Sequence, residues 1–259
     1  MSINSGKDDD EAIDYSLQYK AWHNDSPEHV EGMTQFLRRK LAPFLPPPGP
    51  AGVLDIGCGM GFALLTLRKL GFSNLCGIDT DPEQVKACQG FGLPVELVSD
   101  SVAFLAARPE QFGTVLLLDV LEHMPAAQQI RLMRAVYRAL EPSGRVIVQV
   151  PNSASIMATW QRYIDFTHHS SFTPVSMRFV LQSAGFEDIR IQGQGPLRRP
   201  SLRLWRPSAR AALRRWLVRY AWRQVLTVEI GEWFRIDDIP CELDMLTVAL
   251  KAPRPGSSG

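Results

Sequence analysis

The residues whose types and spacing most suggest chemistry are an aspartate and three glycines, in Asp55-Ile56-Gly57-Cys58-Gly59-Met60-Gly61. The run Val53-Leu54-Asp55-Ile56 is typical of a buried strand, and the residues from Phe62 onward have helical composition. Glycines between a strand and a helix let the chain turn tightly and let a ligand approach the backbone. The pattern therefore predicts a nucleotide-type site at the start of a helix.

Two details of this stretch favour a cationic ligand over a dinucleotide. The glycine spacing is G-x-G-x-G, whereas dinucleotide-binding turns carry G-x-G-x-x-G. The carboxylate of Asp55 would repel a pyrophosphate and attract an ammonium group. S-adenosylmethionine has an amino-acid tail, a sulfonium and no phosphate, so it is the expected ligand. A purely structural turn is the alternative.

Further apolar runs end in acids. Leu75-Cys76-Gly77-Ile78-Asp79 predicts the next strand, and α/β nucleotide-binding folds place the carboxylate that holds the ribose hydroxyls at this point. Phe112 to Leu118 predicts a central strand that is buried on both faces. Asp119 follows it, at the sheet edge where ligands bind in such folds.

Together, VLDIGCGMGF and GIDTDPEQV resemble the class I S-adenosylmethionine-dependent methyltransferases. The resemblance continues through Val98-Ser99-Asp100, Leu117 to His123 and Gly144 to Asn152. An N-cap on the following helix is a second role for Asp100, and both roles can hold at once. The resemblance implies that Asp55, Gly57, Cys58 and Gly59 contact the methionine end of the cofactor and that Asp79 and Thr80 contact its ribose. It also implies that Asp100 and Ser101 contact the adenine and that Asp119 and Val120 lie near the sulfonium.

The stretch Asp119-Val120-Leu121-Glu122-His123 bears on the type of reaction. Methyltransferases that act on adenine or amide nitrogen tend to carry Asn/Asp-Pro-Pro-Tyr/Phe here, which this chain does not. The Leu-Glu-His form resembles the ubiquinone-type and polysaccharide-cluster methyltransferases, which mostly methylate oxygen. His123 is a candidate base or a residue that orients the loop. One carboxylate, Glu122, makes a poor metal site, so we assign no metal.

The polar stretch from Tyr163 to Ser176 is the most informative region on the acceptor side. It resembles the Asp-x-Thr-His…Phe-Thr-Pro loop of methyltransferases encoded with glycan assembly enzymes. His168 matches the histidine of that loop and His169 does not, and Ser170-Ser171 replace the usual Val-Arg or Glu-Arg pair. A turn is predicted at residues 141–144 and the fifth strand from Arg145 to Val150. Asn152 and His169 follow this strand, so they are candidate acceptor-binding residues.

A hydroxyl acceptor gives His168 a chemical role. A sugar hydroxyl loses its proton as the methyl group is transferred, and a histidine with a pKa near neutrality accepts it well. Asp165 is predicted to orient the imidazole and to stabilise its charged form. The alternatives are that Asp165 and His168 only pin the loop and cap the next helix, or that the reaction uses no base.

The N-terminal region is expected to cover the site. Tyr15, Tyr19 and Trp22 share one face of a predicted helix, and they either bind substrate as part of a lid or pack on the core. A second helix is predicted from Pro27 to Leu41, followed by a proline-rich linker.

Residues 198–223 depart from the pattern of the family, because nine arginines and no acid occur among tryptophans and a tyrosine. From Arg215 onward, Arg215, Arg219 and Arg223 share one helical face and Trp216 and Tyr220 take the other. Three roles fit this pattern. The helix could be solvated and packed on the domain, it could contact an anionic membrane surface, or it could bind a phosphorylated or acidic acceptor. Nucleic acid is not expected as a partner, because the formal net charge is only +1.

The predicted fold is α/β, a Rossmann-like seven-stranded, mostly parallel sheet with an N-terminal helical cap and an Arg-rich helical insertion before the last strand. The four cysteines lack metal-ligand spacing and the chain has no signal peptide or apolar run of membrane-spanning length, which favours a cytoplasmic protein, peripheral to the inner membrane face if the arginines bind it. The predicted parts are a disordered tail and helical cap at 1–50, a cofactor-binding core at 51–195, an Arg/Trp-rich insertion at 196–240, a final strand at 241–252 and a disordered tail at 253–259.

By resemblance, the function is that of an S-adenosylmethionine-dependent O-methyltransferase with a small-molecule or glycan acceptor. The expected acceptor is a sugar hydroxyl of a glycan or a glycosylated metabolite. A quinol or phenol is the alternative within the same enzyme class. A non-catalytic cofactor-binding protein that docks through its Arg-rich insertion is the alternative from another class.

Overall fold

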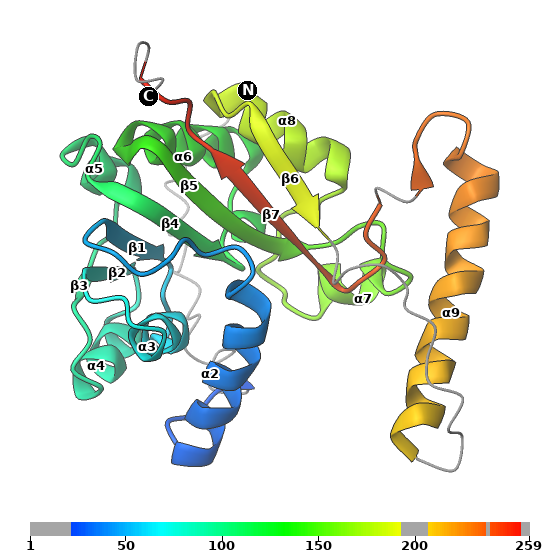
Figure 1. Ribbon diagram of the computed structural model, residues 1–259, viewed down its shortest axis with the longest axis horizontal. Coiled ribbons are helices and arrows are strands. Elements are labelled where there is room, and N and C mark those ends of the chain that lie inside the picture. Colours follow the sequence, from blue (N-terminus) through cyan, green and yellow to red (C-terminus); the bar gives the residue numbers. More distant parts are fainter. Residues whose placement is uncertain (1–21, 193–206, 237–238, 255–259) are drawn as a thin grey trace, which may run out of the picture.

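The computed structural model is built around a seven-stranded sheet with helices on both faces (Figure 1). It describes residues 22–192, 207–236 and 239–254. The strand order is β3-β2-β1-β4-β5-β7-β6, in which β1 to β5 pair in parallel and β7 runs antiparallel to β5 and β6. This arrangement confirms the predicted Rossmann-like, mostly parallel sheet.

The central strands are short apolar segments that helices cover on both sides. All five residues of β1 are buried, so its sequence does not alternate between apolar and polar residues, and Asp55 is its one charged residue. The strands are β1 Gly52–Ile56, β2 Leu75–Asp79, β3 Val95–Leu97, β4 Phe112–Leu118, β5 Leu140–Pro151, β6 Asp188–Gln192 and β7 Asp244–Leu250.

Two hydrophobic clusters divide the helices between the two faces. One cluster packs α5, α6 and α8 against the sheet, with Val136 and Leu181 fully buried. The other packs α2, α3 and α4 against the opposite face around Leu41 and Leu64. The helices on these faces are α2 Pro27–Leu41, α3 Phe62–Lys69, α4 Pro82–Gly90, α5 Ser101–Ala106, α6 Ala126–Ala139 and α8 Pro174–Ala184.

Capping residues set where several of these helices begin. Ser26, Asp81 and Thr173 each accept a hydrogen bond from a first-turn backbone N–H, and each is followed by a proline at the start of the helix. The first of these positions agrees with the predicted helix from Pro27 to Leu41. Three further helical segments lie outside the two layers or between strands: the 3₁₀ turn η1 Leu121–His123, α7 Ala158–Tyr163 and α9 Pro207–Ile230.

The start of β5 differs from its prediction. The sequence predicts a turn at residues 141–144 and a strand from Arg145, whereas β5 begins at Leu140. Leu140 pairs with Phe112, and the register then shifts before Arg145 pairs with Thr114. Residues 141–144 thus lie opposite residue 113 alone, and Ser143 has a φ of 62°, so the predicted turn is an irregularity inside the bounds of β5.

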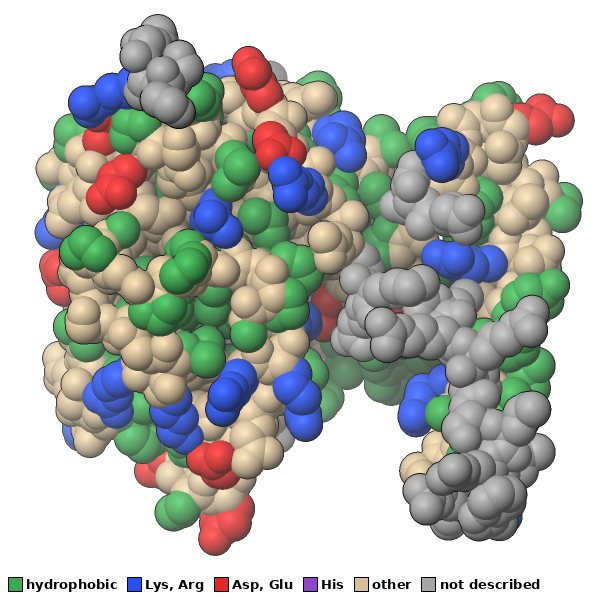
Figure 2. Space-filling view, in the orientation of Figure 1, with side chains coloured by type: hydrophobic (Ala, Val, Ile, Leu, Met, Phe, Trp, Pro, Cys, Tyr) green, Lys and Arg blue, Asp and Glu red, His purple; other side chains and the backbone are tan. Residues whose placement is uncertain are grey.

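The long helix α9 lies beside the sheet domain, next to the ends of β6 and β7 (Figure 1). Trp222 Nε1 donates to the carbonyl oxygen of Ala154 (2.7 Å), and Arg219 pairs with the buried Glu242 (3.5 Å). The arginine face of the helix thus contacts the protein at Arg219. Hydrophobic side chains are visible along the helix in Figure 2. The side chains of Leu217, Val218, Tyr220 and Val228 are 49–80 % exposed.

No helix in the described part of the chain is long and apolar enough to cross a membrane.

Candidate active site

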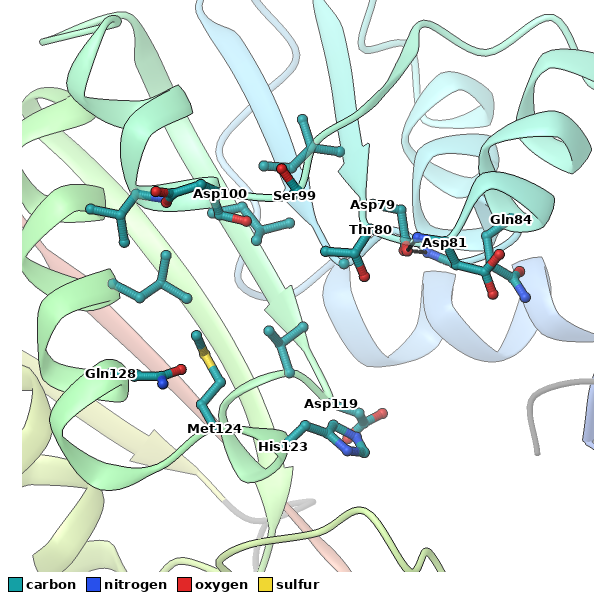
Figure 3. Close-up of a pocket in the computed structure, with 18 of the residues that line it drawn as sticks. Asp79, Thr80, Asp81, Gln84, Ser99, Asp100, Asp119, His123, Met124 and Gln128 are labelled. Atoms are coloured by element: carbon teal, nitrogen blue, oxygen red, sulfur yellow. Dashed lines mark hydrogen bonds between the residues drawn. The ribbon is translucent and has the colours of Figure 1, made fainter. Parts of the chain in front are cut away.

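A cavity of about 550 Å³ opens at the carboxyl ends of β1, β2 and β4 (Figure 3). It extends from the glycine turn after β1, past the end of β2, to the 3₁₀ turn after β4. Nine of the residues singled out from the sequence line it: Gly57, Gly59, Asp79, Thr80, Asp100, Ser101, Asp119, Val120 and His123. The fold therefore gathers into one cavity carboxylates that lie far apart in the sequence.

The glycine turn has a backbone that other residues would strain. Gly57, Gly59 and Gly61 have φ values of 68°, 53° and 77°, in the left-handed region. A Cβ on Gly57 would also approach Val120 Cγ2 to 2.8 Å. The turn is held by Gly57 N–H, which donates to the carbonyl oxygen of Ile78 (2.9 Å). Glycine is therefore required here for backbone geometry and for close packing.

Asp79 ends β2 and is tied to the glycine turn. Its Oδ2 accepts from Gly59 N–H (2.8 Å) and its Oδ1 accepts from Asp81 N–H (2.9 Å). Partial burial raises the pKa of Asp79, and these backbone hydrogen bonds oppose the rise. These two backbone hydrogen bonds fix the orientation of the Asp79 carboxylate, which lines the cavity.

Asp55 lies in β1 beneath the turn and does not line the cavity. It is 2 % exposed, and burial, followed by the charge of Asp79, raises its pKa to about 8. A nearby cation would stabilise the ionised form of this carboxyl group and lower its pKa, because the attraction offsets the lost hydration. Cys58 is also buried and outside the cavity lining; its backbone N–H donates to the Ile78 carbonyl (3.1 Å).

Asp100 has the capping role that the sequence allowed. Its Oδ1 accepts from the backbone N–H groups of Val102 (2.9 Å) and Ala103 (3.0 Å), which fixes the start of α5. The side chain is exposed and lines the cavity together with Ser101. The second oxygen is therefore placed where a ligand could reach it.

Asp119 is held in a strained conformation directly after β4. Its φ is 58°, which is uncommon for a residue with a side chain and is often found at functional sites. Its Oδ2 accepts from Gln149 Nε2 (2.6 Å). The carboxylate is open to the cavity, but loss of hydration and the charge of Asp244 raise its pKa to about 6. Lys40 and Gln149 act in the opposite direction.

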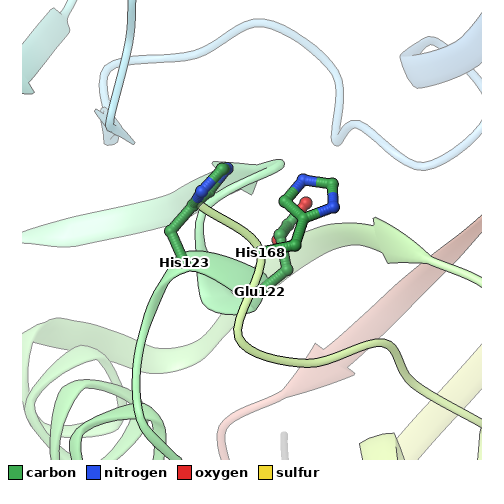
Figure 4. Close-up of side chains that lie close together, drawn as sticks. All are labelled: Glu122, His123 and His168. Atoms are coloured by element: carbon green, nitrogen blue, oxygen red, sulfur yellow. The ribbon is translucent and has the colours of Figure 1, made fainter. Parts of the chain in front are cut away.

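Two histidines meet beside Asp119, with their ring centroids 4.8 Å apart (Figure 4). His168 Nδ1 lies 2.9 Å from the Gln161 carbonyl oxygen. A carbonyl only accepts, so Nδ1 carries the proton in the neutral ring and Nε2 has the lone pair. His123 Nδ1 contacts Thr167 Oγ1 (2.9 Å), and burial followed by His168 lowers the pKa of His123.

Asp165 has a different role from the predicted one. Its Oδ1 accepts from both Thr167 N–H (2.8 Å) and Thr167 Oγ1–H, and Thr167 in turn contacts His123. The Gln161 carbonyl, rather than Asp165, is bonded to the imidazole of His168. The carboxylate therefore supports the loop and, through Thr167, the orientation of His123.

The environment of Glu122 is not evident from the sequence. This residue is fully buried, and neither carboxylate oxygen accepts a hydrogen bond from another described residue. Burial, followed by Asp119, raises its pKa well above the usual range. One ligand atom each from Glu122, His123 and His168 lie within 4.8 Å of one another, so this set could hold a cation. Only the fold could reveal it, because His168 comes from a distant loop.

Two candidate acceptor-binding residues are placed differently from each other. Asn152 is fully buried: Nδ2 donates to the carbonyl oxygens of Pro240 and Glu242 (both 2.8 Å), and Oδ1 accepts from Ala154 N–H (3.0 Å). This geometry gives Asn152 a structural role between β5 and the segment before β7. His169 is exposed, and its backbone N–H donates to the Glu122 carbonyl (2.7 Å).

The aromatic lid is described only in part. Tyr15 and Tyr19 lie outside the described residues. Trp22 is 56 % exposed, so its ring does not pack into the core. Nearby, His23 and His29 contact the ring of Phe62 at the start of α3, with centroids 5.4 and 5.6 Å away. The segment before α2 therefore reaches the first turn of the helix that follows the glycines.

The fold and the cavity together define an α/β protein with a cofactor site at the carboxyl edge of its sheet. A family model described as "Methyltransferase domain" matches residues 29–191. The chain is 31% identical over 182 residues to a ubiquinone biosynthesis O-methyltransferase of Xanthomonas euvesicatoria pv. vesicatoria, covering 63% of this chain and 72% of the relative. It is 26% identical over 194 residues to a protein of the same name from Cereibacter sphaeroides, covering 68% and 77%.

Solved structures share the fold. A SAM-dependent methyltransferase from Archaeoglobus fulgidus has a TM-score of 0.62 at 22% identity, covering 92% of this chain and 100% of that one. A phosphoethanolamine N-methyltransferase 2 of Haemonchus contortus, in complex with S-adenosyl-L-methionine, has a TM-score of 0.54 at 18% identity, covering 88% and 54%. This chain belongs to the methyltransferase-domain family and is a class I S-adenosylmethionine-dependent methyltransferase.

Proposed function

We propose that this enzyme transfers the methyl group of S-adenosylmethionine to a hydroxyl oxygen of a small molecule, and that the acceptor is a quinol or phenol. The relatives named ubiquinone biosynthesis O-methyltransferase support this acceptor over the sugar hydroxyl that the sequence favoured. The observation that carries the proposal is the His168 imidazole beside the cavity, with Nδ1–H bonded to the Gln161 carbonyl and Nε2 able to accept a proton.

The proposed reaction is an in-line displacement. The acceptor oxygen attacks the sulfonium methyl, the S–CH₃ bond breaks as the O–CH₃ bond forms, and the hydroxyl proton passes to Nε2 of His168. The products are the methyl ether and S-adenosylhomocysteine. A phenolic hydroxyl has a pKa near 10, as in tyrosine, so it loses its proton to a histidine more readily than a sugar hydroxyl does. Most of the remaining rate gain comes from placing the two reactants in line.

We assign the cofactor roles along the cavity in the same order as the resemblance implies. The turn at Gly57 and Gly59 takes the methionine moiety, and Asp55, which lies beneath the turn and outside the cavity lining, attracts its ammonium group through charge. Asp79 takes the ribose hydroxyls and Asp100 the adenine amino group. Asp119 lies beside the sulfonium, where its negative charge favours the cationic cofactor over the neutral product.

The test is methyl transfer from labelled S-adenosylmethionine to a matched pair of acceptors, a catechol and a sugar of similar size. The expected result is a labelled methyl ether of the catechol and none of the sugar. Labelling of the sugar alone would overturn the quinol assignment in favour of the sugar hydroxyl that the Asp165 to Pro174 loop suggested. Because Glu122, His123 and His168 could hold a cation, each assay is run with and without a chelator.

The Arg-rich insertion supports a second proposal, peripheral contact of a cytoplasmic enzyme with an anionic membrane surface. Arg210, Arg214 and Arg215 are exposed on α9, as are Leu217 and Val218. Basic and apolar side chains together suit such a surface. Sedimentation with vesicles that contain anionic lipid tests this contact, with neutral vesicles as the control. Equal recovery with both vesicles would contradict it.

A further inference from the structure

Three segments that are distant in the sequence meet through polar side chains beside the acceptor side of the cavity. Lys40, near the end of α2, lies 3.0 Å from Asp244 Oδ2 at the start of β7. Gln161 Nε2, on α7, donates to the other oxygen of Asp244 (3.0 Å). The side chain of Lys40 is only 10 % exposed and that of Asp244 is 27 % exposed, so solvent screens this ion pair less than it screens a surface pair.

Apolar packing holds the helix that carries Gln161 only weakly, and its other bond to a distant segment is from the exposed Arg162 Nη2 to the His169 carbonyl oxygen (3.1 Å). All six residues of α7 are at least partly exposed, and Trp160 and Tyr163 are 60 % and 72 % exposed. Burial of apolar surface therefore contributes little to the position of α7. The side-chain bond from Gln161 to Asp244 joins it to β7, which the sheet holds firmly between β5 and β6.

The same residue, Gln161, contacts the proposed base through its backbone. Its carbonyl oxygen accepts from Nδ1 of His168 (2.9 Å). The hydrogen bond at one ring nitrogen decides the tautomer, and hence which nitrogen can accept a proton. A shift of α7 would remove this acceptor, and the neutral ring would then be free to adopt both tautomers.

We propose that Lys40, Asp244 and Gln161, here called the cap bridge, are positioning residues that hold α7 so that His168 keeps Nδ1 protonated and presents Nε2 to the acceptor. The bridge joins the N-terminal cap helix to the last strand and to the loop that carries the base. The charge of Asp244 also raises the pKa of Asp119, and the charge of Lys40 lowers it. This inference rests on the proposed role of His168 as the base, and the experiment below separates the two.

The decisive variants are Gln161→Met and Lys40→Met. Gln161→Met removes the side-chain donor and leaves the backbone carbonyl, and Lys40→Met removes the charge while it keeps the length of the side chain. Lys69→Met is the matched control, because Lys69 also forms an ion pair with α2, at Glu31 (2.7 Å), but both side chains are about half exposed. S-adenosylmethionine titration and thermal melting confirm that each variant is folded.

The readout specific to the bridge is the tautomer of His168, measured by nitrogen-15 NMR of the imidazole in the full-length protein. The wild type and Lys69→Met are expected to show Nδ1–H, and Gln161→Met a mixture of tautomers. In the same variant we expect kcat to fall about tenfold while the cofactor Kd changes less than about twofold. The double variant Lys40→Met/Asp244→Asn is expected to lose no more activity than the worse single variant, since both disrupt one bridge.

Pure Nδ1–H in Gln161→Met and Lys40→Met, with kcat equal to that of Lys69→Met, would overturn the cap bridge. Failure of the base assignment has a different signature, namely full turnover in His168→Ala. In that case the tautomer measurement still decides whether the bridge positions the ring. If Lys40→Met does not fold, Gln161→Met decides alone, because Gln161 lies on a partly exposed helix.

Discussion

The candidate site has two halves that are built in different ways, a cofactor half in the cavity and a proposed acceptor half that adjoins it at His123. The cofactor half, residues 55–61, 79–81 and 99–102, is held by backbone groups of neighbouring strands and turns. Gly57 N–H donates to the Ile78 carbonyl oxygen, and Gly59 N–H donates to Asp79. The proposed acceptor half, residues 122–123, 161–169 and 244, depends more on side chains from separate segments, such as Gln161 with Asp244 and Thr167 with His123.

This difference determines what a substitution does in each half. The backbone bonds of the cofactor half remain when most side chains are replaced, so its shape depends on glycines and on the carboxylates themselves. Several bonds of the acceptor half are made by side chains that single substitutions remove, although the backbone N–H of His169 also donates to the Glu122 carbonyl oxygen. We infer that the acceptor site of this fold can change while the cofactor site stays the same, and the following predictions probe that contrast.

The largest effect is expected at the proposed base. His168→Ala should lower kcat about 10³-fold, the range of general-base catalysis, because no group then accepts the hydroxyl proton. The cofactor Kd should stay within about twofold, because His168 belongs to the acceptor half. Steady-state kinetics and calorimetric titration give the two quantities. Gln182→Ala, at an exposed position of α8, is the control. A large loss of cofactor affinity in His168→Ala would contradict the division into halves.

The next effect is expected at Asp79, in the cofactor half. Asp79→Ala removes the carboxylate and releases the Gly59 N–H that it accepts from. S-adenosylmethionine affinity should fall about 100-fold, or about 2.7 kcal/mol, as for a lost hydrogen bond to a charged group. Calorimetric titration with the cofactor and with S-adenosylhomocysteine measures it. Unchanged affinity would show that the ribose assignment is wrong.

In the cofactor half, Asp55 should make the stability of the folded protein depend on pH. An unfolded aspartate ionises near pH 4, whereas Asp55 in the folded protein keeps its proton up to about pH 8. Folding therefore favours the protonated form, so its contribution to stability is present at low pH and is lost as the pH rises from about 4 to 8. Asp55→Asn should thus stabilise the cofactor-free protein at pH 8 relative to pH 5, by a few kcal/mol at most, and should weaken cofactor binding.

Thermal melting at pH 5 and pH 8 provides the check on Asp55. Equal shifts in melting temperature at the two pH values would mean that the carboxyl group is not held protonated. Saturating S-adenosylmethionine should reduce the pH dependence in the wild type, since an ammonium group near Asp55 favours its ionised form.

The smallest effects are expected from alanine substitutions at two glycines, which should change stability in opposite directions. Gly57→Ala should lower the free energy of unfolding by about 1–3 kcal/mol, because φ is 68° and the new Cβ would meet Val120 at 2.8 Å. Gly90→Ala, in α4 with open space around it, should raise stability by about 0.5–1 kcal/mol through helix propensity. Denaturant unfolding measures both. Equal effects would mean that the turn tolerates a side chain.

The fold and the cofactor half could be predicted because their signals are local. An apolar run, a glycine turn and a terminal acid occur within a few residues of each other, and the order of the strands brings Asp79 and Asp119 to one edge. The limits of β5 were predicted less well. Ser143 and Gly144 look like a turn in sequence, and only the pairing of Leu140 with Phe112 places them inside the bounds of β5.

The sequence by itself determined the class of this protein, the turn at Gly57 to Gly61, the carboxylates along the cavity and the histidine of the acceptor loop. The tertiary structure alone decided which groups surround that histidine. It placed the Gln161 carbonyl rather than Asp165 on His168, buried Glu122 without a polar partner among the described residues, and joined Lys40 to Asp244. The physical reason is range: dihedral preferences and hydrophobic patterns act between neighbours in the chain, whereas these contacts form only after packing brings distant segments together.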